Sequence, residues 1–580
     1  MSQTDGTTNS RAIPHMKGEC ILDWKPRDSY TSIADIVTKR SGLSEDELLH
    51  PKSTSPTEIE NLQNAAKRIK KAVKNGERIS VMGDYDVDGI TSTAILHFTL
   101  TKLGSSPFLR LPKRFSEGYG LNVAVIDEFE SGLLITVDNG IAANDAVKAA
   151  KEKGLDVIVL DHHLPQEQLP CADIIVDPHV SPEKNGFVDY CGAGIAYKLA
   201  QLLIKDNAFL KEMEVLAAIG TIADSVSLVG DNRVIVKGGL KSMKNGDNLV
   251  PGLKALFQMA EVYDINETDI GFKIGPMLNA AGRLKDDGAA LSLNTIIAKT
   301  ESESSELAFE LKTLNDQRKN MTASTEAIIE EIIRDDCLYF DKPMCILAEG
   351  IPEGIVGILT GRIAEKYKTP TFILTNTETP GVYKGSGRSY GDYNLMDAVN
   401  AAMPFLLVGG GHAGAAGISV NKDNYTNMVD AMREAMASYE APEVTTLEYD
   451  MEINTAQIAE TYLEVEKFAP FGQGNPRPVF CVTDIMLSPR GGSTAKYMGK
   501  TMEHVKLLAR NFSVICFGAS EEYRRMGCPI NIDAIGELSK NVFRYNSELQ
   551  IEAIEFREHK KPATGKPSSL LDALRRNGTI

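Results

Sequence analysis

Three short apolar runs in the first third of the chain each end in residues that bind divalent cations. The runs cover residues 78–82, 133–137 and 157–160, and they are followed by Asp84-Tyr85-Asp86-Val87-Asp88, Asp138-Asn139-Gly140 and Asp161-His162-His163. Alternate side chains of an extended segment share one face, so the three aspartates of the first motif can converge on one site. Five aspartates and two histidines delivered together indicate metal-assisted hydrolysis.

The types of ligand narrow the choice of metal. Carboxylate and imidazole groups suit Mn²⁺ well and Mg²⁺ less well, and the lack of thiolates disfavours structural zinc. The carboxylates suffice for two ions bridged by one aspartate, and such a pair activates water and stabilises the attacking and leaving oxygens. A single aspartate at a strand end is more often a turn former or a helix N-cap. Three such strand ends, with a His-His pair, favour the metal site.

The elements that would position these residues form a parallel α/β sheet. From residue 58 to 185, β-like runs alternate with helical stretches, and 172–178 predicts a fourth strand. Buried parallel strands are short apolar runs, and their carboxyl ends meet at one edge of the sheet. Helices are predicted from residue 192 to 336, where the stretch 301–334 contains few helix breakers.

Two further units follow the predicted long helix. A second α/β unit is predicted from 343 to 438, with strands at 344–348 and 371–375 and a glycine-rich end at 409–417. The region 441–557 is rich in strands and turns, which predicts a small β-barrel or sandwich. The expected organisation is a partly disordered lead-in (1–55), a catalytic domain (56–300), a connecting helix (301–336), a second domain (337–440), a β domain (441–557) and a flexible tail (558–580) with one or two helical turns at 570–576.

Composition indicates a globular chain of the cytosol. The 580 residues are 43% hydrophobic and 24% charged, and the net charge of −17 argues against a polycation that coats nucleic acid. The eight cysteines show no C-x-x-C spacing, so we expect reduced thiols in the cytoplasm. Residues 1–11 lack the apolar segment of a signal peptide, and no apolar run approaches the length of a membrane span.

The three strand-end motifs resemble the first three motifs of the DHH phosphoesterase superfamily. The superfamily's fourth motif resembles residues 220–226, which implies Asp224 as the remaining ligand. The implied metal ligands are Asp84, Asp86, Asp88, Asp138, His162, His163 and Asp224. The resemblance implies catalytic roles for Asp86, Asp138, His162 and His163. Of these, His163 is the best candidate either for a contact with the phosphate or for a contact that supports a metal ligand.

Further motifs resemble the RecJ branch of this superfamily from about residue 50 to 557. They are Pro112–Phe115 with Glu117–Gly120, Gly275–Pro276 with Asn279–Arg283, Gly354–Ile358, Lys384–Ser389, Gly409–Gly417 and Pro470–Pro478. The resemblance implies an α/β fold, in which a parallel-sheet DHH domain and a smaller DHH-associated domain are joined by a long helix and followed by an all-β OB-fold. One departure is Glu349–Glu353, which stands where RecJ proteins usually carry a Trp-His pair.

The resemblance to RecJ implies a pocket for the 5′-phosphate of the strand. Arg114, Arg283 and Arg388 are predicted in separate Gly/Ser-rich loops, and arginine forks suit terminal phosphates. The glycine-rich segment exposes backbone N–H groups to phosphate, although a tight strand-to-helix turn is the alternative. An isolated arginine is more often solvated or in a surface ion pair. The predicted contacts are Arg114, Asn279, Arg283, Ser386, Arg388, Gly410, Gly411 and His412.

Basic residues with interleaved aromatics occur between 489 and 512. Their charges suit a nucleic-acid backbone and the rings of Tyr497 and Phe512 suit bases, while Glu503 is the only acid there. A β-hairpin with a solvated basic face is the alternative. The predicted contacts on the OB-fold are Arg490, Lys496, Tyr497, Lys500, Lys506 and Arg510.

The resemblance implies a 5′-to-3′ exonuclease that degrades single-stranded DNA in repair and recombination. Two Mn²⁺ or Mg²⁺ ions would assist hydrolysis, and 5′-mononucleotides would be released. We expect a monomer that works with a helicase or a single-strand-binding protein. A phosphodiesterase for short oligonucleotides or cyclic dinucleotides is one alternative, but it needs no third domain. An inactive nucleic-acid-binding scaffold is another, but none of the expected ligands is missing.

Overall fold

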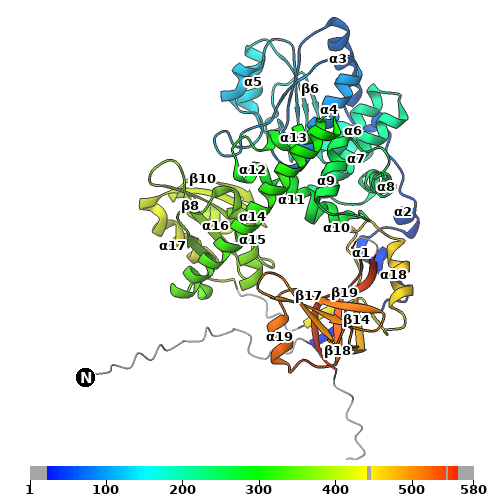
Figure 1. Cartoon of the computed structure of the whole chain (residues 1–580). Helices are drawn as coiled ribbons and strands as arrows, with labels where there is room; N and C mark the ends of the chain where they lie inside the picture. Colours follow the sequence, from blue (N-terminus) through cyan, green and yellow to red (C-terminus); the bar gives the residue numbers. More distant parts are fainter. Residues whose placement is uncertain (1–22, 440–445, 544–545, 560–580) are drawn as a thin grey trace, which may run out of the picture. The chain divides into compact units, whose positions relative to one another are not determined.

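Figure 1 shows a computed structural model of the whole chain, which describes residues 23–439, 446–543 and 546–559. Residues 1–22 of the partly disordered lead-in predicted at 1–55 lie outside the described residues, as do the tail turns predicted at 570–576. Contacts divide the chain into two compact units, and we describe each by itself. The described part of the first comprises residues 50–439 and 472–474, and that of the second comprises 23–49, 446–471 and 475–559.

The first unit begins with a five-stranded parallel sheet. Its strand order is β3 (Phe108–Arg110), β2 (Ile79–Met82), β4 (Leu133–Val137), β5 (Asp156–Leu160) and β6 (Ile174–Val176). All residues of β2 and β4 are buried, as expected of parallel strands covered on both faces. The order places the ends of β2, β4 and β5 side by side, so the motifs that follow them share one edge.

Helices cover both faces of this sheet. Alternate residues of β4 point to opposite faces: Ile135 packs in the core formed with α4, α6 and α7, while Leu134 packs against α5. The helices here are η1 (Pro56–Glu58), α3 (Leu62–Asn75), α4 (Val87–Lys102), η2 (Val123–Glu128), α5 (Asn144–Glu152), η3 (Pro182–Lys184), α6 (Gly192–Leu203), α7 (Asn207–Ala223), α8 (Gly230–Asn245), α9 (Pro251–Met259), α10 (Glu267–Asp269), η4 (Ile270–Ile274), α11 (Gly275–Leu278), α12 (Ala280–Leu284) and α13 (Ala289–Ile297).

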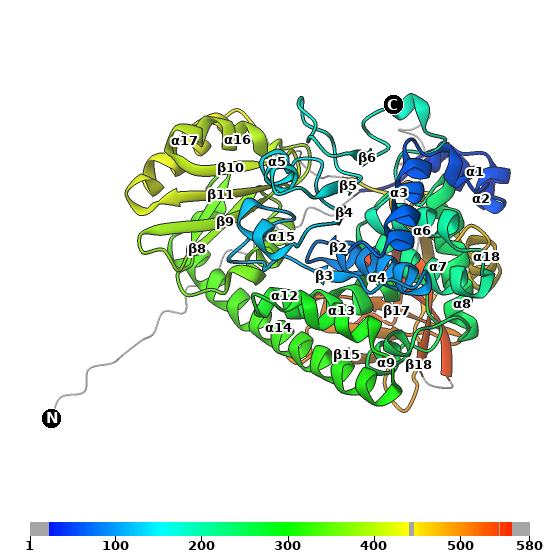
Figure 2. The same ribbon diagram turned by 90° about the horizontal axis from the view of Figure 1, so that it is seen from above.

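One long helix, α14 (Glu301–Asp335), connects the two parts of the first unit. Thr300 caps its start by accepting a hydrogen bond from the backbone N–H of Glu303. The helix packs against α9 and α13 near its beginning and against α15 (Glu353–Tyr367) further along (Figure 2). The predicted long helix is therefore confirmed.

The second part of the first unit is a mixed five-stranded sheet. Its order is β10 (Leu406–His412), β11 (Ala415–Asn421), β9 (Val382–Arg388), β8 (Thr371–Asn376) and β7 (Met344–Leu347), and only β7 and β8 are parallel. Helices α16 (Leu395–Ala402) and α17 (Tyr425–Met436) cover one face, while α14 and α15 cover the other. Short turns η5 (Leu338–Phe340), η6 (Met403–Phe405) and η7 (Lys422–Asn424) link these elements. The glycine-rich segment forms the β10–β11 hairpin, so the alternative of a strand-to-helix turn is wrong.

The second unit is a seven-stranded sheet with helices around it. The strand order is β13 (Met451–Ile453), β14 (Val479–Met486), β18 (Asn531–Phe543), β19 (Asn546–Glu558), β17 (Phe512–Cys516), β16 (His504–Leu508) and β15 (Ala495–Met498). Its helices are α1 (Ile33–Ser41), α2 (Glu45–Leu49), α18 (Ile458–Glu466) and α19 (Ser520–Arg525). The predicted β-rich third region is confirmed.

Part of the predicted lead-in belongs to this second unit. β1 (Asp23–Pro26) pairs in parallel with β12 (Thr446–Tyr449), and Arg27 and Arg40 both form ion pairs with the buried carboxylate of Asp450. A buried carboxylate needs charged partners, so these arginines fix residues 23–49 to the β domain. Among the described residues, no helix combines the length and the apolar character needed to cross a bilayer.

Candidate metal centre and phosphate pocket

The first aspartate motif lies where β2 runs into α4. Asp86 caps the helix by accepting a hydrogen bond from the N–H of Gly89 at 3.1 Å. Asp88 lies in the first turn, and its carboxylate accepts the N–H groups of Gly192 and Ala193, at 2.6 and 2.8 Å, at the start of α6. The N-cap interpretation therefore holds for Asp86, but capping leaves the three carboxylates close to one another.

The other strand ends and α7 bring the remaining predicted ligands to the same place. Three groups have ligand atoms that all lie within 4.8 Å of one another: Asp84, Asp86 and Asp138; Asp88, His162 and Asp224; and Asp138, His162 and His163. The Nε2 atom of His162 lies 3.1 Å from Asp138 Oδ1 and 3.8 Å from Asp224 Oδ2. Asp138 belongs to two groups, as an aspartate bridging two ions would.

The carboxylates of this cluster are buried or half-buried, and their nearest possible cations are the rings of His162 and His163. Burial and the neighbouring Asp86 raise the pKa of Asp84 to about 8, and burial and Asp88 raise the pKa of Asp224 to about 8. The same two causes, burial and Asp88, raise the pKa of Asp138 well above its ordinary value. One oxygen of Asp84 is buried without a hydrogen-bond partner, and within the described ranges none of these three carboxylates pairs with a lysine or arginine. Divalent cations would relieve this repulsion, so the residues fit a two-metal site.

Asp161 plays a different part from its neighbours. It accepts the N–H of Ile141 at 2.9 Å, and the Nδ1 atom of His163 lies 2.7 Å away. Burial opposes both charges, but the hydrogen bond between them lowers the pKa of Asp161 and raises the pKa of His163 to about 9. Asp161 therefore orients the ring of His163.

Tyr119 is a site residue whose role the sequence did not reveal. Its hydroxyl donates to the backbone carbonyl of Asp138 at 2.6 Å, and its oxygen lies 3.2 Å from ring nitrogens of His163. Gly118 and Gly120, both at positive φ, flank it. The only sequence signal was its place in the loop Glu117–Gly120.

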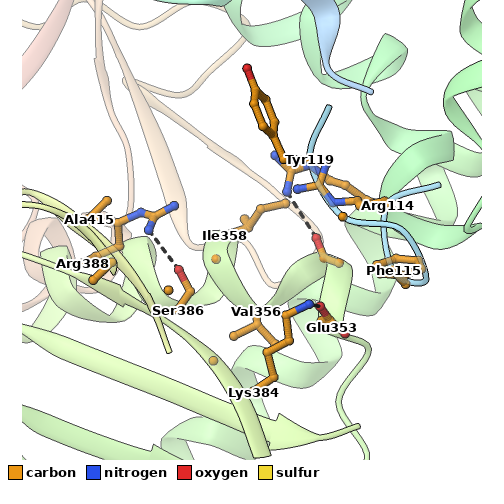
Figure 3. Close-up of a pocket in the computed structure, with 18 of the residues that line it drawn as sticks. Arg114, Phe115, Tyr119, Glu353, Val356, Ile358, Lys384, Ser386, Arg388 and Ala415 are labelled. Atoms are coloured by element: carbon orange, nitrogen blue, oxygen red, sulfur yellow. Dashed lines mark hydrogen bonds and ion pairs between the residues drawn. The ribbon is translucent and has the colours of Figure 1, made fainter. Parts of the chain in front are cut away.

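The three predicted arginines converge on a pocket of 610 Å³ (Figure 3). Arg114 lies over the ring of Tyr85 at 4.4 Å, Arg283 donates to the carbonyl of Gly354 at 3.2 Å, and Arg388 donates to Ser386 Oγ at 2.9 Å. The prediction that all three lie in loops is wrong. Arg283 belongs to α12 and Arg388 ends β9, where a Cβ atom on the preceding Gly387 would lie 2.4 Å from the ring of Phe372.

The charge of this pocket suits an anion. Burial and the nearby Arg114 lower the pKa of Arg283 to about 10, and burial lowers the pKa of Arg388. Within the described residues, none of the three arginines forms an ion pair with an acid. Lys384 and Glu353, which pair with each other, complete the charged lining. Uncompensated guanidinium groups in a half-enclosed pocket favour phosphate.

The remaining predicted phosphate contacts are distributed unevenly. Gly411 and His412 line the pocket, and His412 is exposed there. Gly410 is exposed in the same strand without lining the pocket. Asn279 lies after α11, outside the pocket lining, with a buried side-chain oxygen that has no partner. The segment that departs from the Trp-His pattern leads into α15 and contributes Glu353 to the lining.

The basic segment of the second unit is less free than its sequence indicates. Arg490 and Lys506 form ion pairs with Glu548, an acid that lies outside the segment. Phe512 is buried in the core, so its predicted exposure as a stacking residue is wrong. Tyr497 is half-buried under Arg524, at 4.2 Å from guanidinium to ring. Lys496, Lys500 and Arg510 are exposed, and Arg490 and Arg510 line a cavity of 490 Å³.

A parallel sheet with clustered Asp and His at its strand ends, linked by a long helix to a sheet with a glycine-rich hairpin, defines a phosphoesterase of the DHH type. Three family models match the chain: the DHH family, N-terminal domain, at residues 78–221, the DHHA1 domain at 341–438, and the RecJ OB domain at 449–555.

Comparison with individual known proteins narrows the family further. The single-stranded-DNA-specific exonuclease RecJ of Bacillus subtilis is 33% identical over 90% of this chain and 67% of its own length. The crystal structure of RecJ from Thermus thermophilus in complex with Mn²⁺ has a TM-score of 0.76 at 27% identity, covering 94% of this chain and 79% of that one. Its complex with Mg²⁺ has a TM-score of 0.69 at 25% identity, covering 94% and 78%. The chain belongs to the RecJ family.

Proposed function

We propose that this protein is a single-stranded-DNA-specific exonuclease that hydrolyses phosphodiester bonds from the 5′ end and releases 5′-mononucleotides. The observation that carries the proposal is the arrangement of the ligand cluster and the arginine pocket. Tyr119 lines the pocket and also donates to the backbone of Asp138. An end held in the pocket would therefore present a following phosphodiester at a fixed place.

The cluster would hold two Mn²⁺ or Mg²⁺ ions. Asp84, Asp86 and Asp138 would bind one, and Asp88, His162 and Asp224 would bind the other. Asp138, whose Oδ1 atom lies 3.1 Å from Nε2 of His162, would be shared. When bound, the ions supply Lewis acidity and lower the pKa of water, which is the chemistry of two-metal hydrolysis.

The side chains around the cluster would position the scissile group. Burial lowers the pKa of His162, so it stays neutral with a lone pair for a cation. His163, held by Asp161 and Tyr119, would donate a hydrogen bond to a phosphate oxygen. The hydrogen bonds from Gly192 and Ala193 fix the direction of Asp88.

The arginine pocket would bind the terminal 5′-phosphate and set the polarity. Arg114, Arg283 and Arg388 supply guanidinium forks, and Ser386 adds a hydroxyl. Anchoring the end before cleavage makes removal of one nucleotide at a time the natural outcome. A substrate without a 5′ end near the pocket would lose this anchoring.

The β domain would hold the strand further from its end. Lys496, Lys500 and Arg510 offer exposed charge to a single-stranded backbone. We infer that the protein acts as a monomer in the cytoplasm on single strands made available by a helicase or a single-strand-binding protein, in DNA repair and recombination. The match to the RecJ OB domain supports a long nucleic acid over a dinucleotide as substrate.

A degradation assay tests the proposal. A single-stranded 40-mer labelled at its 3′ end would be incubated with Mn²⁺, beside the same strand in a duplex and an RNA of the same sequence. We expect loss of the single-stranded DNA alone, and none with chelator or with Asp138→Ala. An intact 40-mer with cleavage of di- and trinucleotides would instead indicate a small-substrate phosphodiesterase.

A further inference from the structure

The arginine pocket contains one acid that phosphate binding does not explain. Glu353 is the first residue of α15, and its carboxylate forms an ion pair with Lys384 of β9 (Figure 3). Of the residues that line this pocket, all of which are described, Glu353 is the only acid. An acid in an anion site lowers the affinity for anions, so the presence of Glu353 in this pocket calls for an explanation.

The charge of the pocket lining limits how much negative charge of a bound group it can balance. Arg114, Arg283, Lys384 and Arg388 oppose the single carboxylate of Glu353, which leaves a net formal charge of three positive units with His412 neutral. A terminal monophosphate carries a charge of about −2 near neutral pH, and a terminal triphosphate carries roughly twice that. The positive charge of the lining therefore exceeds the negative charge of a monophosphate, but it is smaller than the negative charge of a triphosphate.

The position of Glu353 is fixed by the pocket itself. A Cβ atom on the next residue, Gly354, would lie 1.9 Å from the carbonyl oxygen of Arg283, so the two backbones are in contact. Arg283 also donates to the carbonyl of Gly354. The start of α15 therefore cannot withdraw Glu353 from the pocket without displacing a phosphate-binding arginine.

Size does not exclude a longer phosphate chain. At 610 Å³ the pocket lies within the range of small-molecule sites, about 300–1,000 Å³. The side chains of Glu353 and Lys384 are 31% and 45% exposed, so solvent and salt reach the pair. Discrimination between end groups must therefore come from charge, and it must weaken with salt.

We propose that Glu353 makes the pocket selective for 5′-monophosphate ends over 5′-triphosphate ends. This inference rests on the proposed function, because it names the end group that the same pocket accepts. Repulsion by the carboxylate is the element that acts against the wrong substrate, while the arginines serve both. Lys384 moderates the repulsion by pairing with the carboxylate.

The test compares three single strands of one sequence with 5′-hydroxyl, 5′-monophosphate and 5′-triphosphate ends, each labelled at the 3′ end. The quantity is the ratio of kcat/KM for monophosphate over triphosphate, in wild type and in Glu353→Gln, Lys384→Met and Glu365→Gln. Glu365 lies on the same helix, pairs with Lys368 and lies outside the pocket lining, so it is the matched control.

We expect Glu353→Gln to lower the ratio about fivefold, an effect of a partly screened charge, and Lys384→Met to raise it. Glu365→Gln should leave the ratio unchanged, and the wild-type ratio should fall as NaCl is increased. An unchanged ratio in Glu353→Gln, or a wild type that treats both ends alike, overturns the inference. A wild type that leaves the monophosphate strand intact contradicts the proposed function itself, and the two failures are thereby distinguished.

Discussion

At the scale of single residues, the site is an assembly of charges that the folded chain alone does not balance. Asp138 shows this most clearly, because it adopts a left-handed backbone at φ 61° directly after β4. A non-glycine residue in that conformation costs stability, and such residues cluster at functional sites. Its carboxylate is fully buried beside those of Asp84, Asp86 and Asp88. The position therefore combines backbone strain with charge repulsion, and a bound cation would relieve the repulsion.

Asp138→Asn separates function from stability at this position. Asparagine tolerates positive φ and removes one negative charge, so the metal-free protein should keep its fold and unfold about 1–2 °C higher. Activity with Mn²⁺ should fall by about 10³-fold, because the ligand shared by two groups is lost. Thermal unfolding with chelator and single-strand degradation measure the two effects. A variant that unfolds earlier but keeps its activity would refute the assignment.

The raised pKa values predict how metal binding depends on pH. Asp84 and Asp224 have pKa values of about 8 without metal, so below that pH a cation must displace protons. Titration calorimetry in two buffers of different ionisation enthalpy should show proton release at pH 7, and Mn²⁺ affinity should rise from pH 6 to 8.

The same pKa shifts determine whether the free energy of unfolding rises or falls with pH. The folded chain binds more protons than the unfolded one between the ordinary pKa of aspartate and about 8, so the free energy of unfolding without metal falls as pH rises through this window. Saturating Mn²⁺ should reduce that slope. Metal binding without proton release, together with a flat stability profile, would contradict the raised pKa values.

At the scale of elements, the strand ends position the predicted ligands, and the β10–β11 hairpin contributes to the lining of the arginine pocket. Gly411 adopts φ 148°, and a Cβ atom there would lie 2.3 Å from the carbonyl oxygen of Ala415. A Cβ atom on the neighbouring Gly410 would meet nothing within 4 Å. The two glycines therefore serve different purposes. The hairpin conformation requires glycine at position 411, whereas glycine at position 410 leaves the exposed backbone accessible.

The pair Gly411→Ala and Gly410→Ala tests this distinction. Gly411→Ala should destabilise the hairpin by about 2–3 kcal/mol, because both the φ angle and the contact with Ala415 resist a side chain. Gly410→Ala should stay within about 0.5 kcal/mol of wild type. Chemical denaturation of the two variants gives the comparison, and equal losses would show that the hairpin does not depend on Gly411.

The sequence predicted the elements better than it predicted contacts between them. The strands before Asp84, Asp138 and Asp161 were visible because buried parallel strands are apolar throughout. Arg283 was assigned to a loop because the preceding Gly282 resembles a turn residue, whereas both residues lie within the short helix α12. Two contacts join segments that are distant in the sequence: the hydrogen bond of Tyr119 to Asp138 and the ion pair of Arg490 with Glu548. No local sequence pattern could predict them.

At the scale of the whole molecule, an acidic chain has two local groups of basic residues. The net charge is −17, yet the phosphate pocket and the exposed residues Lys496, Lys500 and Arg510 are basic. Local basic surfaces of this kind can attract a nucleic acid even where the net charge is negative. We infer that the basic residues of the β domain add to the binding of a long single strand.

The double variant Lys496→Glu and Arg510→Glu tests the contribution of the β domain. Reversing two exposed charges should raise KM for a 40-mer several-fold, on the order of tenfold at low salt, and should leave kcat and the KM for a trinucleotide unchanged. Lys25→Glu, on β1 of the same unit, serves as an exposed control. An equal change for long and short substrates would mean that these residues do not bind the strand.

The polarity of degradation tests the central claim most directly. Two strands of one sequence would carry nuclease-resistant phosphorothioate linkages, one at its first five 5′ linkages and the other at its last five 3′ linkages. A metal cluster served by a 5′-phosphate pocket predicts that the 3′-protected strand is degraded to mononucleotides and its resistant end, while the 5′-protected strand persists. Persistence of the 3′-protected strand with loss of the 5′-protected one would contradict the account.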